Sequence, residues 1–366
     1  MAESRLDLVG RSLTPNLVLN VDGEQFEHWI SAEVEQSLDT IAWRFSMKYL
    51  DRRQSNLADQ SDTGSIVIGN RCTVILGIAP LFQGHIDRLT QSLSGDDRTW
   101  TAEGRSVTGD LVDCSAVHKT STWRNKTALE IIQALCEPFG IPVLCPDGDD
   151  ERFARFAIIE GETVFNAIDR LCKVRGFIPV NSSLNWLFLR RFDDTVSIPL
   201  PMELIISRTI EQDFSDRYSD YVAHATDIDG KGSQQDSNVT RYRPLVIVPQ
   251  VPSTAEQQKT RAQWEQAIRA GRSERYRCTV LGLVDMNGDP YEPGRLYRVE
   301  DTQLNVQETL LCARVVFRVS ESESVTELEL CRQESYSLRD FPEKLLSGTT
   351  KKGKKITKKV TKAPKR

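Results

Sequence analysis

Cysteine and histidine are the side chains of this sequence best suited to nucleophilic chemistry, and one pair lies close together. Cys114 and His118 are four positions apart on an expected loop, where a histidine base could activate a thiol. Nothing else in the sequence orients this pair, so we predict no catalytic role for it. The other histidines, His28, His85 and His224, are far apart along the chain. His28 and His85 lie on expected strands, and we interpret them as ordinary core or surface side chains.

Carboxylates offer two further kinds of chemistry. Asp147, Asp149, Asp150 and Glu151 form an acidic run that could attract calcium. The run lacks the alternating ligand spacing and the distant glutamate of an EF-hand loop, so we interpret it as a solvated turn. With 52 acidic residues a glycosidase-like carboxylate pair is conceivable, but nothing selects a pair. We therefore predict no catalytic, metal-binding or cofactor-binding residues.

The common signatures of enzymes and metal sites are missing from the sequence. It contains no GxSxG elbow, HExxH helix, Walker loop or GxGxxG fingerprint. The eight cysteines include no CxxC pair, which argues against structural zinc and against a disulfide framework. Five cysteines lie among apolar neighbours and are expected to be buried thiols: Cys72, Cys136, Cys172, Cys312 and Cys331.

Charge is distributed unevenly along the chain. The net charge is −5, yet Ser347 to Arg366 holds eight lysines, one arginine and no acid, so residues 1–346 carry a net charge of −14. This basic tail has almost no apolar residues and is expected to be disordered. It either binds a polyanion such as nucleic acid or an anionic membrane, or is simply a solvated terminus. It lacks the aromatic residues of a dedicated single-strand reader.

Length and composition indicate a multidomain protein. A chain of 366 residues with 39% hydrophobic side chains is long enough for two or three domains with their own cores. The longest apolar run, Val74 to Phe82, is interrupted by Gly77 and Pro80 and is too short to span a bilayer. Glu3 and Asp7 lie where a signal peptide would be apolar, so we expect the protein to start in a cytoplasm.

Residues 1–113 have the pattern of antiparallel β structure. Leu17 to Val21 leads into Asp22-Gly23, a dipeptide that readily adopts the positive φ angles of a tight hairpin. Alternating apolar residues from Phe26 to Val34 then predict the return strand, and Ile41 to Met47 predicts the next. Further strands are expected at 66–68, 72–76, 81–89 and 99–103, with a long loop at 51–65. Many short strands at regular spacing favour a sandwich or barrel.

Residues 114–200 contain helical patterns. Thr127 and Glu130 form a capping box, and apolar residues at helical spacing follow up to Gly140. The pattern returns 36 residues later, from Thr163 to Gly176, and each helix precedes strand-like segments. We interpret this part as an α/β domain with a duplicated α-β-β unit.

Strand patterns resume in residues 201–337. They are expected at 203–227, 276–284, 295–300, 310–319 and 326–330. A polar break at 230–238 precedes a helix that starts with the capping box Ser253-Thr-Ala-Glu256 and ends at Gly271. We predict a second β domain with a helical insertion at 231–272, followed by the disordered tail at 338–366.

Several short motifs occur together in an order that is typical of one family. They are Gly84-His-Ile-Asp87, Trp100-Thr-Ala-Glu-Gly-Arg105, Thr108-Gly-Asp-Leu-Val-Asp-Cys-Ser115, Pro138-Phe-Gly-Ile141, Arg269-Ala-Gly-Arg-Ser273 and Glu292-Pro-Gly-Arg295. In this combination the chain closely resembles the baseplate hub proteins of Mu-like contractile phage tails. The resemblance covers nearly all of the chain except the lysine tail.

The resemblance implies an α+β multidomain fold in which two related antiparallel β-barrel domains flank the α/β domain. It also implies a structural protein rather than an enzyme: a homotrimer that adapts the six-fold tail tube above to a separate three-fold, membrane-piercing spike protein below. Other baseplate proteins would be partners, DNA would pass through the bore without specific binding, and no cofactor is needed. The protein would be assembled in the host cytoplasm and become part of the virion. The related secretion-system proteins fuse hub and spike in one chain.

Two other functions remain open at this stage. A tail-associated cell-wall hydrolase would show two carboxylates in a pocket with raised pKa values. An adaptor that binds nucleic acid or membrane through the lysine tail would show salt-dependent affinity that is lost with the tail.

Overall fold

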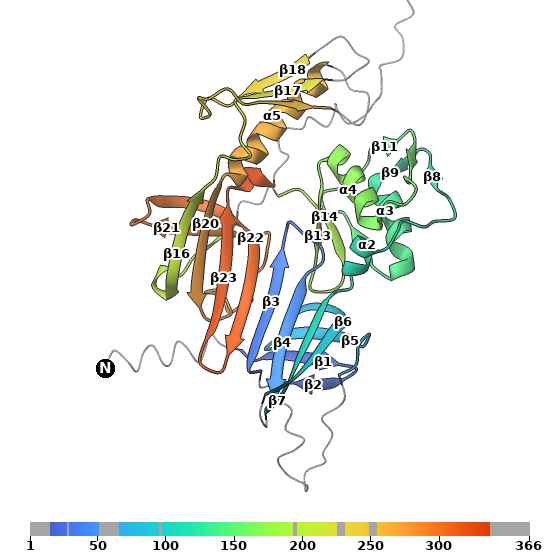
Figure 1. The fold of residues 1–366 in the computed structure, drawn as a ribbon. Helices are drawn as coiled ribbons and strands as arrows, with labels where there is room; N and C mark the ends of the chain where they lie inside the picture. Colours follow the sequence, from blue (N-terminus) through green and yellow to red (C-terminus); the bar gives the residue numbers. More distant parts are fainter. Residues whose placement is uncertain are drawn as a thin grey trace, which may run out of the picture.

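The computed structural model describes residues 15–27, 29–50, 66–94, 97–192, 196–224, 231–248 and 255–336. A broad, mostly antiparallel sheet forms the centre of the molecule (Figure 1). An α/β unit lies beside it, and a small unit made of three strands and one long helix extends from one end. No helix in these ranges is long and apolar enough to cross a membrane.

Both predicted β regions contribute to the central sheet. The first region supplies β1 (Leu17–Val21), β2 (Glu24–Phe26), β3 (Ser31–Ser37), β4 (Arg44–Leu50), β5 (Arg71–Leu76), β6 (Ala79–Ser94) and β7 (Asp97–Ser106). The second region supplies β16 (Ile205–Gln212), β20 (Glu274–Leu281), β21 (Leu296–Asp301), β22 (Val306–Ser320) and β23 (Ser324–Cys331), together with the short β15 (Ser197–Pro199).

The strand order shows how the two regions join. It runs β16-β20-β23-β22-β3-β4-β7-β6-β5-β1-β2, while β21 pairs with β22 and β15 pairs with β21. The junction is the antiparallel pairing of β3 with β22, in which Glu35 lies opposite Val316. Within the described residues the two β regions therefore share one sheet, and its path ends at β16 and at β2.

The main hydrophobic core lies under this sheet, and a smaller separate cluster includes Leu311 and Ala313 of β22. Alternate residues of each strand face the main core, for example Phe45 and Met47 on β4 and Val315 and Phe317 on β22, all of them buried. The period-two pattern of the sequence produces this burial, because successive strand residues point to opposite faces. The shared core places the opposite, polar face of both β regions on one continuous surface.

The predicted hairpin at Asp22-Gly23 is confirmed, since both residues have positive φ and β1 pairs with β2 across the turn. The return strand is shorter than predicted. It stops at Phe26, and β3 starts separately at Ser31 to pair with β4 and β22, because alternation cannot distinguish one strand from two that bury the same face. The strand expected at 66–68 is instead a turn closed by Asn70, whose side chain accepts the Val67 N–H.

The α/β unit contains four helical segments and seven short strands. They are α2 (Gly109–Asp113), β8 (Thr122–Trp123), β9 (Lys126–Thr127), α3 (Ala128–Cys136), η2 (Glu137–Phe139), β10 (Val143–Leu144), β11 (Arg152–Phe153), β12 (Phe156–Ala157), α4 (Val164–Arg175), β13 (Ile178–Asn181) and β14 (Leu187–Arg190). Both predicted helices are confirmed: Thr127 and Glu130 form the capping box of α3, and Thr163 caps α4. Gly140 and Gly176 follow the helical turns with positive φ, as helix ends require.

The predicted duplication is correct only in part. After α3 and α4 the chain enters β10 and β13, and both belong to the sheet β10-β14-β13. The second strand of the first unit, β12, instead pairs with β8. The repeat therefore preserves a helix followed by a strand, and it does not preserve the pairing of the second strand.

The small unit consists of β17 (Asp220–His224), β18 (Lys231–Gln235), β19 (Pro244–Ile247) and α5 (Ala255–Arg272). The predicted helix is confirmed, but Ser253 of its capping box lies outside the described residues. Two predictions are wrong here: β17 belongs to this sheet rather than to the second β region, and the polar break contains β18. Gly232 of β18 lies against α5, where an added Cβ would be 2.1 Å from the Lys259 backbone nitrogen. Glycine at this position lets β18 pack closely against α5, and it does not mark a loop.

Two short 3-10 turns complete the described part of the chain, η3 (Met202–Leu204) and η4 (Gln333–Ser335). The predicted loop at 51–65, the predicted disordered tail and His28 lie outside the described residues.

Candidate functional site

The cysteine and histidine side chains are not arranged for catalysis in the described structure. Cys114 is exposed just after α2. His118 Nδ1 accepts the Thr120 N–H at 3.0 Å, and its ring contacts Trp123 with 5.1 Å between centroids. These contacts give His118 a local structural role. His85 lies within β6, and His224 lies at the end of β17.

The five cysteines that were expected to be buried are buried, as is Cys278. Burial raises the pKa of the Cys136 thiol to about 12, and burial together with Asp87 raises that of Cys72 to about 12. Because the thiolate is the reactive form, these groups are inert at neutral pH.

The acidic run binds neighbouring elements of the α/β unit, so our prediction of a solvated turn was wrong. The Asp149 side chain is only 2% exposed, and its Oδ2 accepts the Leu129 N–H at the start of α3. Asp147 accepts the Arg191 N–H at 2.7 Å. Free amides at a helix start favour a nearby carboxylate, which explains why the run folds back onto α3.

The same run holds α4 through Arg175, whose side chain is 3% exposed. Arg175 forms an ion pair with Glu151, donates to the Glu151 carbonyl at 2.7 Å, and lies 3.8 Å from Asp149. Its guanidinium also lies over the Phe153 ring, 4.2 Å from the centroid. In the described ranges no group of three or more potential ligands is arranged to hold a metal ion.

Three of the six sequence motifs meet at Arg105. Its Nε donates to Asp87 at 2.8 Å and its terminal nitrogen donates to Asp113 at 2.7 Å, so three separate motifs are joined by one guanidinium. The hydrogen bonds to Asp113 and Asp87 raise the pKa of Arg105, and the hydrogen bond from Arg105 lowers that of Asp113. Asp87 lies on β6 and Asp113 ends α2, so the cluster connects the sheet to the α/β unit.

Two motif glycines allow the strands to approach at this junction. A Cβ on Gly84 would lie 1.9 Å from the Arg105 carbonyl oxygen, and one on Gly104 would lie 2.1 Å from the His85 carbonyl oxygen. Neither clash can be relieved by moving a flexible side chain, because the contacted atoms belong to the backbone. These motif residues therefore define a junction in the fold.

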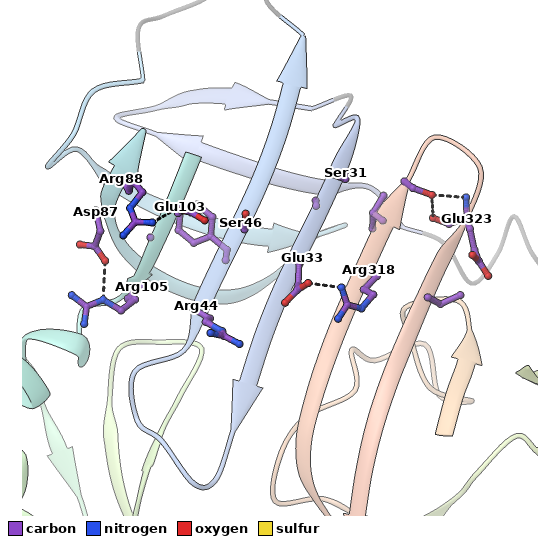
Figure 2. A pocket seen from close by; sticks show the side chains of 16 residues that line it. Ser31, Glu33, Arg44, Ser46, Asp87, Arg88, Glu103, Arg105, Arg318 and Glu323 are labelled. Carbon is purple, nitrogen blue, oxygen red and sulfur yellow. Dashed lines mark hydrogen bonds and ion pairs between the residues drawn. The ribbon is translucent and has the colours of Figure 1, made fainter. Parts of the chain in front are cut away.

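Charged side chains cover the polar face of the central sheet. The ion pairs run across neighbouring strands, from β6 through β3 and β22 to β16. They are Arg88–Glu103, Arg44–Glu35, Arg314–Glu35, Arg318–Glu33, Arg318–Glu327, Arg277–Glu329 and Arg277–Glu211. We call this set the charge ladder. Figure 2 shows its central part, with Glu33 and Arg318 pointing toward each other across the β3–β22 junction.

Glu35 is the most enclosed carboxylate of the ladder at this junction. Its side chain is 12% exposed and lies between Arg314 on β22 and Arg44 on β4. Burial acts to raise its pKa, but the hydrogen bonds and charges of these two arginines outweigh burial and lower the pKa overall. Glu35 is therefore held in its ionised form.

This face is hollowed into a groove of about 910 Å³ where β7, β4, β3, β22 and β23 lie side by side. Four arginines and four carboxylates line it: Arg44, Arg88, Arg105, Arg318, Glu33, Asp87, Glu103 and Glu323. The groove is thus neutral as a whole, although residues 1–346 are strongly acidic. Our sequence analysis missed this surface. The sequence did contain a signal for this surface. Two strands carry an acidic residue at every second position, Glu33 and Glu35 on one and Glu327 and Glu329 on the other.

Comparison with protein families gives three matches along the chain. Residues 16–106 match the N-terminal domain of the Mu phage baseplate assembly protein GpP-like family. Residues 108–189 match the second domain of the baseplate hub protein gp44-like family, and residues 253–339 match the fourth domain of the Mu phage baseplate assembly protein GpP. The baseplate hub protein gp44 of Escherichia phage Mu is 28% identical over 345 residues, covering 88% of this chain and 89% of that protein.

Solved structures agree with these matches. The 43 kDa tail protein of prophage MuSo2 from Shewanella oneidensis has a TM-score of 0.79 at 26% identity, covering 87% of this chain and 99% of that one. A tail protein from Neisseria meningitidis has a TM-score of 0.75 at 20% identity, covering 88% and 99%. An Escherichia coli type VI secretion component, described as similar to T4 tail proteins gp27 and gp5, shares the fold with a TM-score of 0.57 at 10% identity, covering 87% and 78%.

The family matches follow one another in chain order, and each falls on a part of the fold described above. The Arg105 cluster and the two close-packed glycines lie where the first and second matches meet. The chain therefore belongs to the family of baseplate hub proteins of Mu-like phages, and it is a component of the phage tail.

Proposed function

We propose that this baseplate hub works as a closed homotrimeric ring that adapts the six-fold tail tube to a separate three-fold spike. The observation that carries the proposal is the pairing of β3 with β22, which places both β regions in one sheet. Three chains would then present six β regions side by side, matching six tube subunits above. Below, the same ring has the three-fold symmetry of a trimeric spike. A closed ring leaves no unpaired contact surface between copies.

The form of the sheet supports this arrangement. Among the described residues its path is open, ending at β16 on one side and β2 on the other, so these strands of one chain do not close it. Exposed edge strands tend to be covered by a neighbour, and in a ring the neighbour would be the next copy. The polar, hollowed face would then line the bore, because the opposite face is occupied by the hydrophobic core. DNA would pass along this face without specific binding.

We further propose a division of the chain into four parts. Residues 1–113 and 201–337 would be the two related β domains, residues 114–200 the α/β domain, and residues 338–366 a basic tail. The inserted unit of β17, β18, β19 and α5 lies at the end of the sheet, where it could contact other baseplate proteins (Figure 1). Assembly would take place in the host cytoplasm.

The proposal is tested by the mass of the purified protein in solution. Sedimentation equilibrium and native mass spectrometry across a wide concentration range should show a trimer of the 41.4 kDa chain. A protein that remains monomeric or dimeric at every concentration would overturn the ring. An experimental structure in which the two β regions have different strand orders would overturn the pseudo-six-fold symmetry.

A further inference from the structure

The arginines of the charge ladder are all engaged by carboxylates of neighbouring strands. Arg318 contacts Glu33 on β3 and, at 2.8 Å, Glu327 on β23. Arg314 and Arg44 share Glu35 from opposite sides. Arg318 and Arg277 each pair with acidic groups on both adjacent strands.

These arginines are nevertheless accessible to solvent. The side chains of Arg44, Arg318 and Arg314 are 62%, 44% and 36% exposed. A guanidinium with this exposure binds phosphate well, because its planar donors match two phosphate oxygens. An arginine-lined groove along a DNA path would therefore retain DNA, unless other groups occupy those donors.

We propose that Glu33, Glu35 and Glu327 guard the arginines of this face against phosphate, so that the groove can face DNA without holding it. This inference rests on the proposed function, in which the polar face lines the bore. This protection is local, since Glu33 and Glu327 pair with Arg318, and Glu35 pairs with Arg44 and Arg314. General repulsion by an acidic body would not require arginines at these positions at all.

The register of the sheet supports this role. Glu33 lies opposite Arg318 in the β3–β22 pairing, and Glu35 lies opposite Arg44 in the β3–β4 pairing. Direct cross-strand neighbours are close enough to pair without bending the strands. The backbone therefore brings each of these carboxylates to its arginine, and a passing phosphate would have to displace a partner that is already in place.

The test removes the negative charges of Glu33, Glu35 and Glu327 and keeps the arginines. In the full-length protein, the triple variant Glu33→Gln, Glu35→Gln, Glu327→Gln preserves side-chain size and leaves three guanidinium groups able to bind phosphate. A matched control, Glu137→Gln, Glu160→Gln, Asp169→Asn, makes the same change in net charge at exposed or part-exposed carboxylates of the α/β unit. Binding of a 50-base-pair duplex is measured by fluorescence anisotropy from 50 to 200 mM salt.

We expect the triple variant to bind the duplex at least about tenfold more tightly than both the wild type and the control at 50 mM salt. Three added phosphate contacts weaken roughly 40-fold between 50 and 200 mM salt, so the tenfold gain should have disappeared at 200 mM. Equal affinity of the triple variant and the control would overturn the proposal, because net charge alone would then explain the result. Every protein compared contains the lysine tail, so the tail does not contribute to the difference in duplex affinity.

A second variant covers the case in which the first does not fold. Asp87→Asn, Glu103→Gln alters pairs at the surface of the same groove and acts on Arg105 and Arg88. It should also bind the duplex more tightly than a control with two changes in the α/β unit, and no difference would refute the guarding role. Solution mass is recorded for every variant, so that a failure of the ring is seen separately from a failure of the guards.

Discussion

The acidic run at residues 147–151 provides the sharpest test of how this fold is held together. Replacing Asp149 with alanine removes the acceptor of the Leu129 N–H and a buried negative charge 3.8 Å from Arg175. The helix start loses a cap, and the buried guanidinium keeps Glu151 as its close partner.

The expected cost follows from these two losses. Loss of a capping side chain costs about 0.5–2 kcal/mol. Full loss of a buried ion pair costs about 3–5 kcal/mol, and because Glu151 remains only part of that cost applies. We therefore expect the Asp149→Ala variant to be destabilised by about 2–4 kcal/mol in the α/β unit. The neighbouring Asp150 is exposed, so Asp150→Ala should stay within about 0.5 kcal/mol of the wild type.

Native-state hydrogen exchange of the α3 amides measures this cost where it arises. Exchange in Asp149→Ala should be about 30- to 700-fold faster than in the wild type, since each 1.4 kcal/mol is a factor of ten. Equal exchange rates of the α3 amides in Asp149→Ala and in the wild type would show that Asp149 does not stabilise α3. Calcium should protect none of these amides, and calcium-dependent protection that is lost with Asp149 would restore the metal-site interpretation.

Three further predictions address pH, the tail and chemistry. Because the pKa of Glu35 is lowered, its ion pairs stabilise the fold fully above pH 4.5, and this stability is lost as the pH falls through the lowered pKa. Urea unfolding from pH 6 to pH 3 should therefore show a smaller loss of stability for Glu35→Gln than for the wild type. Equal losses would contradict the lowered pKa of Glu35. Deleting Ser347 to Arg366 should leave folding and solution mass unchanged, because the segment has almost nothing to bury; a shortened chain that aggregates or dissociates would show a structural role. The purified protein should not hydrolyse peptidoglycan, and turnover that one carboxylate or cysteine substitution abolishes would refute a purely structural function.

Local signals predicted the local structure well. The Asp22-Gly23 turn, the capping box at Thr127 and Glu130, and the glycine that ends α4 all act within a few residues of their partners. The sequence therefore carried enough information to place these elements. The motifs around Arg105 also indicated the family, although not the salt bridges that connect them.

The remaining features depend on residues far apart in the chain. The β3–β22 pairing joins residues almost 300 positions apart, and no local pattern encodes which edge strands will meet. The position of β17 was mistaken for the same reason, since its apolar alternation fits either sheet. Asp149 was interpreted as solvated because its partners, Leu129 and Arg175, become neighbours only after folding.

The β3–β22 pairing also constrains how the chain is made. About 270 residues separate Ser37 from Val306. At bacterial rates of synthesis, β22 therefore begins to be made about 15 to 55 s after β3 is complete. During that interval one side of β3 is an open strand edge next to the ribosome, where edges of other nascent chains could pair with it. Glu33 and Glu35 place two negative charges on this waiting strand, and like charges repel a second copy of the same edge. The carboxylates that form the charge ladder in the finished sheet would thus first act as protection against aggregation during synthesis.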